Sequence, residues 1–299
     1  MLLIGRLAVQ RQDWDRNGIF SGIVRITIIS LLALAASLWH GPARAYLPPG
    51  EPTYFAGNPS TRQLSFRYRI GMKALGWSSD NTGIYGLFSQ SSFWFLDFED
   101  LGYTVENNFE PEVQFFADGA LLSKAMDWWP QKLDLSMSYS HLSNGINGSL
   151  SRSWNHINGG LYLGDPDQDP LCGSLIGWFP FNVEIHNPDI TRYAGYGQLT
   201  FYVRPPNPLW ALGRTQVYLA SNFTFDSPDG GLFTNLEMSL SFAPGWLARP
   251  PFPKPESSQG SHQPETQFGF FVQWVVGRGE SLIDYRQYQN TVRFGLHLW

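Results

Sequence analysis

The chain has 299 residues, of which 15% are charged and 16% are aromatic. Soluble domains carry about a quarter charged residues, so this chain presents unusually little charge. Intrinsic disorder is excluded, because it needs low hydrophobicity and high charge. A net charge of −5 without a basic patch excludes a nucleic-acid-binding protein. The single cysteine, Cys172, has no partner for an internal disulfide or a structural zinc site.

The N-terminal segment predicts a secretory signal peptide. Residues 26–39 form an apolar run that would be about 21 Å long as a helix, too short for a bilayer core of about 30 Å. Residues 43–45 read Ala-Arg-Ala, which is typical of a signal-peptide cleavage site. We expect residues 1–45 to be removed and residues 46–299 to form a single domain. The alternative is an N-terminal membrane anchor.

The rest of the chain alternates between apolar and polar residues. No segment approaches the roughly 18 consecutive apolar residues of a membrane-spanning helix. Alternation places one set of side chains on each face of a sheet, so it predicts an all-β fold. The alternating stretches cover residues 64–70, 133–139, 181–185, 199–203, 217–219, 236–242 and 292–298.

Two architectures fit this pattern, a soluble β-sandwich and a transmembrane antiparallel β-barrel with its apolar residues outside. The barrel is favoured, because a sandwich would have to expose the charged residues of the polar faces. Aromatic residues also gather near the ends of the expected strands, as interface girdles require. A spanning strand needs about 9–11 residues, so twelve strands fit with long loops. The charged residues on the polar faces are Arg67, Arg69, Asp134, Glu184, Glu237 and Arg293.

Residues 243–267 are rich in Pro, Ser and Gln. Proline cannot donate to a β-ladder, so we expect a loop before the last two strands. The termini of bacterial barrels lie in the periplasm, so counting strands back from the C-terminus makes this loop periplasmic. The same count places residues 144–152 outside the cell. A strand count that is off by one would reverse both assignments.

The residues with catalytic chemistry are concentrated between positions 139 and 155. His141 and Ser143 are two residues apart on an expected strand, so both side chains point to one face, with Cα atoms about 6.7 Å apart. An imidazole beside a hydroxyl can serve as the base for a nucleophile. If residues 144–152 connect a hairpin, Asn155 lies opposite His141, and Ser153 lies opposite Ser143.

These side chains share the register of the apolar residues Leu135 and Met137, so they should face the lipid. Polar side chains on such a face are costly unless they serve a function. A Ser–His pair oriented by Asn is a variant of the catalytic triad in which an amide replaces the carboxylate. A polar girdle satisfied by water at headgroup level remains the alternative.

The sequence His141-Leu-Ser143-Asn-Gly145, followed by Ser-Arg-Ser-Trp-Asn155, resembles the outer membrane phospholipase A family, the bacterial phospholipase A1 family. Further matches lie at residues 108–111, 187–191, 193–196 and 279–285. The resemblance implies a twelve-stranded, multi-pass barrel in the bacterial outer membrane. It also implies a carboxylic ester hydrolase that cleaves the sn-1 and sn-2 acyl esters of phospholipids and lysophospholipids, with calcium as cofactor and a homodimer as the active form.

The resemblance assigns a catalytic role to four residues. Ser143 resembles the nucleophile, His141 the general base and Asn155 the residue that orients the imidazole. Gly145 resembles the oxyanion donor, which acts through its backbone N–H.

The resemblance also implies calcium ligands. Ser151 resembles the hydroxyl ligand and Ile146 a main-chain carbonyl ligand, while Leu101 roughly matches a carbonyl supplied by the partner subunit. Gly148 and His186 stand where enterobacterial members of the family have aspartates. Their loss predicts weaker calcium binding.

Two other functions fit the same fold. One is a passive outer-membrane pore or structural barrel, and the other is a catalytically inactive member of the family. The expected register favours the hydrolase, because a pore has no use for His and Ser side chains that face lipid.

Overall fold

The structure is a computed structural model that describes residues 53–59, 63–76, 81–95, 103–165, 169–183, 187–205, 214–244, 268–283 and 285–298. All of these residues belong to one unit of the chain, Ala45–Trp299. The expected signal peptide lies outside the described residues, as do Leu101, Glu184 and His186. The Pro-rich segment lies outside them as well, except for Ala243 and Pro244.

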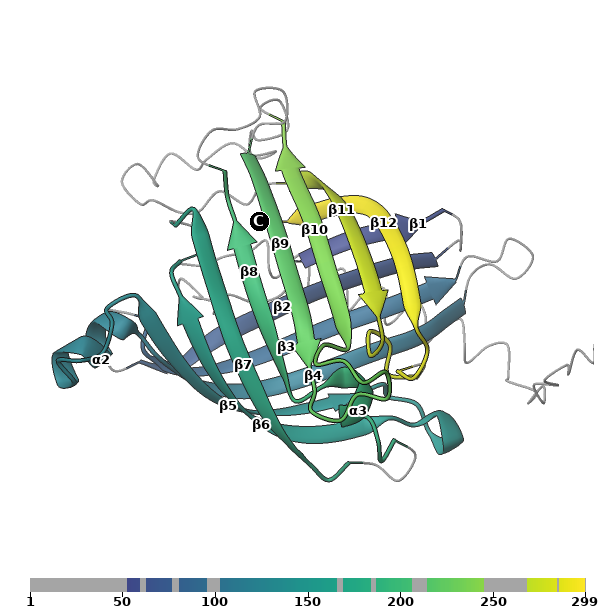
Figure 1. Ribbon diagram of the computed structural model, residues 1–299, viewed down its shortest axis with the longest axis horizontal. Helices are drawn as coiled ribbons and strands as arrows, with labels where there is room; N and C mark the ends of the chain where they lie inside the picture. Colours follow the sequence, from purple (N-terminus) through teal and green to yellow (C-terminus); the bar gives the residue numbers. More distant parts are fainter. Residues whose placement is uncertain are drawn as a thin grey trace, which may run out of the picture. The chain divides into compact units, whose positions relative to one another are not determined.

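Twelve antiparallel strands close into a barrel, in which each strand pairs with its neighbours in sequence and β1 pairs with β12 (Figure 1). The predicted twelve-stranded antiparallel barrel is therefore confirmed. The strands are β1 (Thr53–Asn58), β2 (Gln63–Gly76), β3 (Gly83–Phe95), β4 (Tyr103–Ala117), β5 (Leu133–Ser143), β6 (Ser153–Leu163), β7 (Leu171–Phe181), β8 (Gly197–Val203), β9 (Arg214–Phe223), β10 (Asn235–Ala243), β11 (Phe268–Gly277) and β12 (Gln289–Leu298).

Three short helices lie in the connections that the structure describes: α2 (Gly119–Ala125), the 3-10 helix η1 (Gly148–Leu150) and α3 (Thr191–Ala194). None of the helices in the described residues is both long and apolar enough to cross a membrane. The short helices matter because η1 and α3 belong to connections around the candidate site.

The barrel wall has an apolar outer face and a polar inner face. Polar side chains such as Ser140, Gln273 and Arg293 are completely buried inside. Large apolar side chains are exposed on the outside, among them Phe55, Met72, Val113, Met137, Leu175, Phe201 and Phe294. A soluble sandwich would bury its apolar face, so this distribution excludes it and fits a barrel surrounded by lipid.

One strand prediction was wrong. The strand expected over residues 181–185 does not continue past Phe181, where β7 ends, because Asn182 has a φ of 47° that turns the chain; residues 184 and 185 lie outside the described residues. Val183 instead packs against an apolar cluster inside the barrel. The strand that does form, β7, is hard to predict from the sequence, since Gly173, Gly177 and Pro180 interrupt its alternation of apolar and polar residues.

Three connections meet at one end of the barrel, which we call the mouth. They are the β5–β6 connection (residues 144–152), the segment between β7 and β8 that contains α3, and the β11–β12 connection (residues 278–283 and 285–288). Antiparallel strand order puts the junctions of the Pro-rich segment, Ala243 and Phe268, at the opposite end. The cellular side of each end remains a prediction.

Candidate active site

β5 and β6 form a hairpin in the register that the sequence predicts. His141 lies opposite Asn155, and Ser143 lies opposite Ser153. A shift of one residue would turn the apolar side chains of both strands inward, so the apolar pattern fixes this pairing. The register expectation is confirmed.

The three candidate side chains project from the outer face of this hairpin. On β5, Tyr139 is 48% exposed, whereas Ser140 is completely buried inside the barrel. On β6, Ile157 is 43% exposed, whereas His156 is buried. The candidate serine, histidine and asparagine have odd residue numbers, like Tyr139 and Ile157, and are half-buried. Since strand side chains alternate, all three face the apolar surroundings of the barrel.

A hydrogen bond orients the imidazole. His141 Nδ1 lies 2.9 Å from Asn155 Oδ1. An amide oxygen can only accept, so a neutral imidazole in this arrangement carries its proton on Nδ1 and has its lone pair on Nε2. Within the described residues no hydrogen bond joins Ser143 Oγ to His141. A hydrogen bond between a general base and its nucleophile often tightens only when substrate binds.

Asn144 organises the connection that follows Ser143. Its side chain is buried, and its Oδ1 accepts hydrogen bonds from the backbone N–H of Arg152 (3.0 Å) and of Ile146 (3.3 Å). Its Nδ2 donates to the carbonyl of Leu150 at 2.8 Å. One side chain therefore ties both ends of the connection together and holds its backbone next to the candidate nucleophile.

Gly145 takes a conformation that favours glycine. Its φ is 63°, and an added Cβ would lie 3.3 Å from the ring of Phe109. The chain therefore turns two residues after the candidate nucleophile, at a position that carries no side chain. The role of the Gly145 N–H as an oxyanion donor remains a prediction.

The β5–β6 connection offers oxygen donors for a hard cation but no carboxylate. Ser151 and Ile146 lie within it, and a hydroxyl and a carbonyl are ligand types that calcium accepts. Among the described residues there is no cluster of three or more His, Cys, Asp or Glu side chains that could hold a metal ion. The donor chemistry fits calcium, while the local negative charge that would strengthen its binding is missing.

The inner face of the same hairpin is packed. Leu142 and Trp154 lie opposite each other, each between two of the outward-facing positions. Trp154 is 3% exposed and belongs to an apolar cluster with which Leu142 is in contact. The other buried members of the cluster come from the two further connections at the mouth: Ile190, Ala194, Leu282 and Tyr285. The wall that carries the candidate triad is thus supported from inside the barrel.

Comparison with known proteins identifies the family. Residues 57–298 match the family model of phospholipase A1. The chain belongs to this family. Phospholipase A1 of Escherichia coli strain K12 is 27% identical over 237 residues, which cover 79% of this chain and 68% of the relative. Phospholipase A1 of Proteus vulgaris is 27% identical over 239 residues, with the same coverage.

Solved structures share the fold. Outer membrane phospholipase A from Escherichia coli matches with a TM-score of 0.63 at 21% identity, over 88% of this chain and 95% of the other. A Salmonella typhi outer membrane phospholipase, described as a dimer with bound calcium, matches with a TM-score of 0.63 at 22% identity, over 87% and 94%. Phospholipases of this family are carboxylic ester hydrolases, and this chain is a member.

Two features of the candidate site in this phospholipase A1 family member were not predicted from its sequence. Tyr139 donates a hydrogen bond from its hydroxyl to Asn155 Oδ1 at 3.1 Å. The sequence could have revealed this contact, because Tyr139 shares the outward face and is a diagonal neighbour of Asn155. The second feature is the packing of Leu282 in the same inner cluster as Trp154. It has no local signal, since it depends on how the closed barrel brings distant connections together.

The β11–β12 connection of this family member is anchored by buried polar contacts. The carboxylate of Glu106 on β4 accepts hydrogen bonds from the backbone N–H of Leu282 (2.5 Å) and Ile283 (3.0 Å) and from the Ser281 hydroxyl. Arg293 on β12 forms a buried ion pair with Glu280. These contacts anchor the connection that contributes Leu282 to the cluster inside the β5–β6 hairpin.

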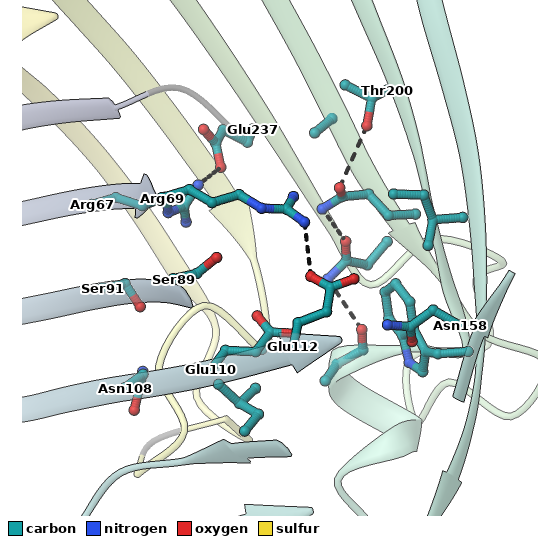
Figure 2. Close-up of a pocket in the computed structure, with 18 of the residues that line it drawn as sticks. Arg67, Arg69, Ser89, Ser91, Asn108, Glu110, Glu112, Asn158, Thr200 and Glu237 are labelled. Carbon is teal, nitrogen blue, oxygen red and sulfur yellow. Dashed lines mark hydrogen bonds and ion pairs between the residues drawn. The ribbon is translucent and has the colours of Figure 1, made fainter. Parts of the chain in front are cut away.

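The lumen is crossed by ion pairs. Figure 2 shows Arg67 and Arg69 reaching from β2 toward Glu237 on β10 and Glu112 on β4. The nitrogen–oxygen distances are 3.3 Å for Arg67–Glu237 and 2.7 Å for Arg69–Glu112. They line a polar cavity of about 250 Å³. Charged side chains that bridge the interior restrict passage, so the lumen is poorly suited to a pore.

Proposed function

We propose that this protein is a calcium-dependent phospholipase of the bacterial outer membrane. It hydrolyses the sn-1 and sn-2 acyl esters of phospholipids and lysophospholipids with Ser143, His141 and Asn155. The observation that carries the proposal is the hydrogen bond between His141 and Asn155 on the outer wall, with Ser143 two residues along the same strand face. Membership of the phospholipase A1 family supports the substrate class.

In the proposed reaction, Ser143 Oγ attacks the ester carbonyl while His141 Nε2 takes its proton. The Asn155 oxygen holds the Nδ1 proton and stabilises the imidazolium. The Gly145 N–H donates a hydrogen bond to the oxyanion. His141 then protonates the leaving lysophospholipid oxygen, and a water molecule activated by the same imidazole hydrolyses the acyl-serine to release a fatty acid.

Calcium would be held by the Ser151 hydroxyl, the Ile146 carbonyl and, from a partner subunit, the Leu101 carbonyl. When bound, it supplies positive charge that stabilises the oxyanion. Excess chelator should abolish activity, and Ser151→Ala should raise the calcium concentration needed for half-maximal rate. Turnover that persists in chelator would contradict the proposal.

The effect of the missing carboxylate on calcium binding can be tested by introducing an aspartate at position 148. An added side chain at Gly148 meets no atom within 4 Å, and although the φ is 80°, aspartate tolerates this region better than most residues. Gly148→Asp should lower the calcium requirement. Gly148→Asn, which has the same shape without the charge, is the matched control and should change it little.

The outer-membrane location follows from the barrel and its apolar outer face, and we propose that the mouth is extracellular. The triad then lies at the depth of the outer leaflet and encounters phospholipids that reach it. A triad on an outer wall has no pocket of its own, so we propose that two barrels pack side by side and enclose the acyl chain. Crosslinked dimers should carry the activity, and a fully active monomer would contradict this.

The proposed function is tested by phospholipid hydrolysis with purified protein and calcium. Ser143→Ala should be inactive, His141→Ala nearly so, and Asn155→Ala should retain measurable activity, because the serine–histidine pair survives. Each variant should show the heat-dependent gel mobility of a folded barrel. Wild-type activity in folded Ser143→Ala would eliminate the proposed triad, whereas no hydrolysis by the wild-type protein would favour an inactive barrel or a passive one.

A further inference from the structure

The amide of Asn155 receives two hydrogen bonds on the same oxygen. His141 Nδ1 lies 2.9 Å and Tyr139 Oη 3.1 Å from Asn155 Oδ1. Tyr139 precedes His141 by two residues on β5, so both side chains project from the same face, toward the neighbouring strand that carries Asn155. The tyrosine hydroxyl thus contacts the residue that orients the imidazole.

An amide has a specific need for such a contact. A carboxylate presents two equivalent oxygens, whereas an amide that rotates by half a turn presents its NH₂ group in place of oxygen. With NH₂ facing Nδ1, the imidazole must accept there and carry its proton on Nε2. That tautomer cannot take a proton from Ser143, so the amide orientation decides whether His141 is a base.

The tyrosine hydroxyl favours the productive orientation. In the observed arrangement its O–H donates to Asn155 Oδ1. If the amide rotated, the phenol oxygen could accept from Asn155 Nδ2, but its own O–H would lose this acceptor on a wall that faces lipid. An unsatisfied donor in apolar surroundings costs about 1–3 kcal/mol. Only the rotated orientation of the Asn155 amide carries this free-energy cost.

The tyrosine ring has a fixed position of its own. Its centroid lies 6.0 Å from that of Phe181 on β7, at an interplanar angle of 43°. Phe181 is the residue of β7 that pairs with Asn155. Tyr139 therefore reaches across β6, and its ring contact does not depend on the hydroxyl.

We propose that Tyr139 is a positioning residue that locks the Asn155 amide with its oxygen toward His141 and so selects the catalytic tautomer. This inference rests on the proposed triad. It extends the triad by one residue, through a hydroxyl that acts on Asn155.

Tyr139→Phe tests the inference, because it removes the hydroxyl and keeps the ring against Phe181. We expect kcat to fall about three- to tenfold, the effect of one hydrogen bond, with KM unchanged. In the Asn155→Ala background, Tyr139→Phe should have no further effect. Tyr288→Phe, at an exposed tyrosine elsewhere at the mouth, is the control and should leave the rate unchanged.

A second background separates the amide lock from general packing. In Asn155→Asp the orienting carboxylate has two equivalent oxygens and cannot present an NH₂ group to His141. Tyr139→Phe should therefore lower kcat less in this background than in the wild type. An equal loss in all backgrounds, or a wild-type rate in Tyr139→Phe, would overturn the inference. If Ser143→Ala is inactive, such a result removes the role of Tyr139 and leaves the triad intact. Full activity in Ser143→Ala would instead remove the proposed function itself.

Discussion

Leu282 offers a direct test of whether the wall that carries the proposed triad depends on support from inside the barrel. It is 4% exposed and belongs to the cluster that contains Trp154, the inward-facing residue next to Asn155. Leu282→Ala removes a buried side chain from this cluster without touching the outer face. Truncation of a buried leucine to alanine costs about 2–5 kcal/mol.

This cost should appear as local opening of the mouth. The β1–β12 ladder closes the barrel independently of the cluster, and the backbone of Leu282 and Ile283 remains bound to Glu106. We therefore expect amide exchange to accelerate in the β11–β12 connection and at the mouth ends of β5 and β6. In local opening, 1.4 kcal/mol corresponds to a tenfold change, so exchange there should rise by at least about tenfold.

Catalysis should fall with this loosening. A shift of about 1 Å in a catalytic group can cost about a hundredfold in rate, so kcat should drop measurably while KM stays near its wild-type value. Phospholipid hydrolysis and hydrogen exchange would be measured on the same preparation. Leu236→Ala, at a position 37% exposed on β10, is the matched control and should change neither. If Leu282→Ala keeps both wild-type exchange and wild-type kcat, the inner cluster does not support the triad.

Acidification should loosen the mouth, because the Asp189 carboxylate is stabilised there. Burial raises the pKa of Asp189, but the hydrogen bonds from Arg286 and Tyr285 have the larger combined effect and hold this pKa below its ordinary value. This stabilisation is complete above about pH 4 and is lost as the pH falls through the lower folded pKa, which exchange at the mouth would reveal. Asn144→Ala removes three hydrogen bonds of the β5–β6 connection and should lower the rate about a hundredfold in a folded barrel, as measured by activity and gel mobility. Arg67→Ala removes the ion pair between Arg67 and Glu237 and should destabilise the barrel by about 1–3 kcal/mol in urea titrations, without changing kcat.

The sequence predicted the catalytic hairpin because both of its strands alternate clearly. Leu135 and Met137 share their register with His141, and a slip of one residue would turn these apolar side chains into the polar lumen. The same alternation predicted the all-β barrel and the outward face of the triad. β7 was misplaced because glycine and proline obscure its pattern, and the helices in the connections have no amphipathic length to reveal them.

Long-range packing could not be predicted in the same way. The cluster that contains Trp154 and Leu282 joins residues whose separation in sequence carries no periodic signal. The hydrogen bonds of the buried Glu106 could not be predicted from the sequence either, because its partners are backbone N–H groups of a distant connection. Such contacts follow only from closure of the barrel, which brings β4, β6 and the β11–β12 connection to one mouth.

The two faces of the β5–β6 hairpin therefore have different physical roles. The odd positions carry the proposed triad and face lipid. The proposed substrate is this surrounding lipid, and no pocket on the outer face holds the triad residues in place. The even positions face a packed interior, and Leu142 and Trp154 fix the backbone from which the odd side chains project. Because strand geometry couples neighbouring side chains through one backbone, rigidity gained inside reaches the outer wall. A substitution inside should consequently change kcat without changing access of lipid, whereas one on the outer face can change both.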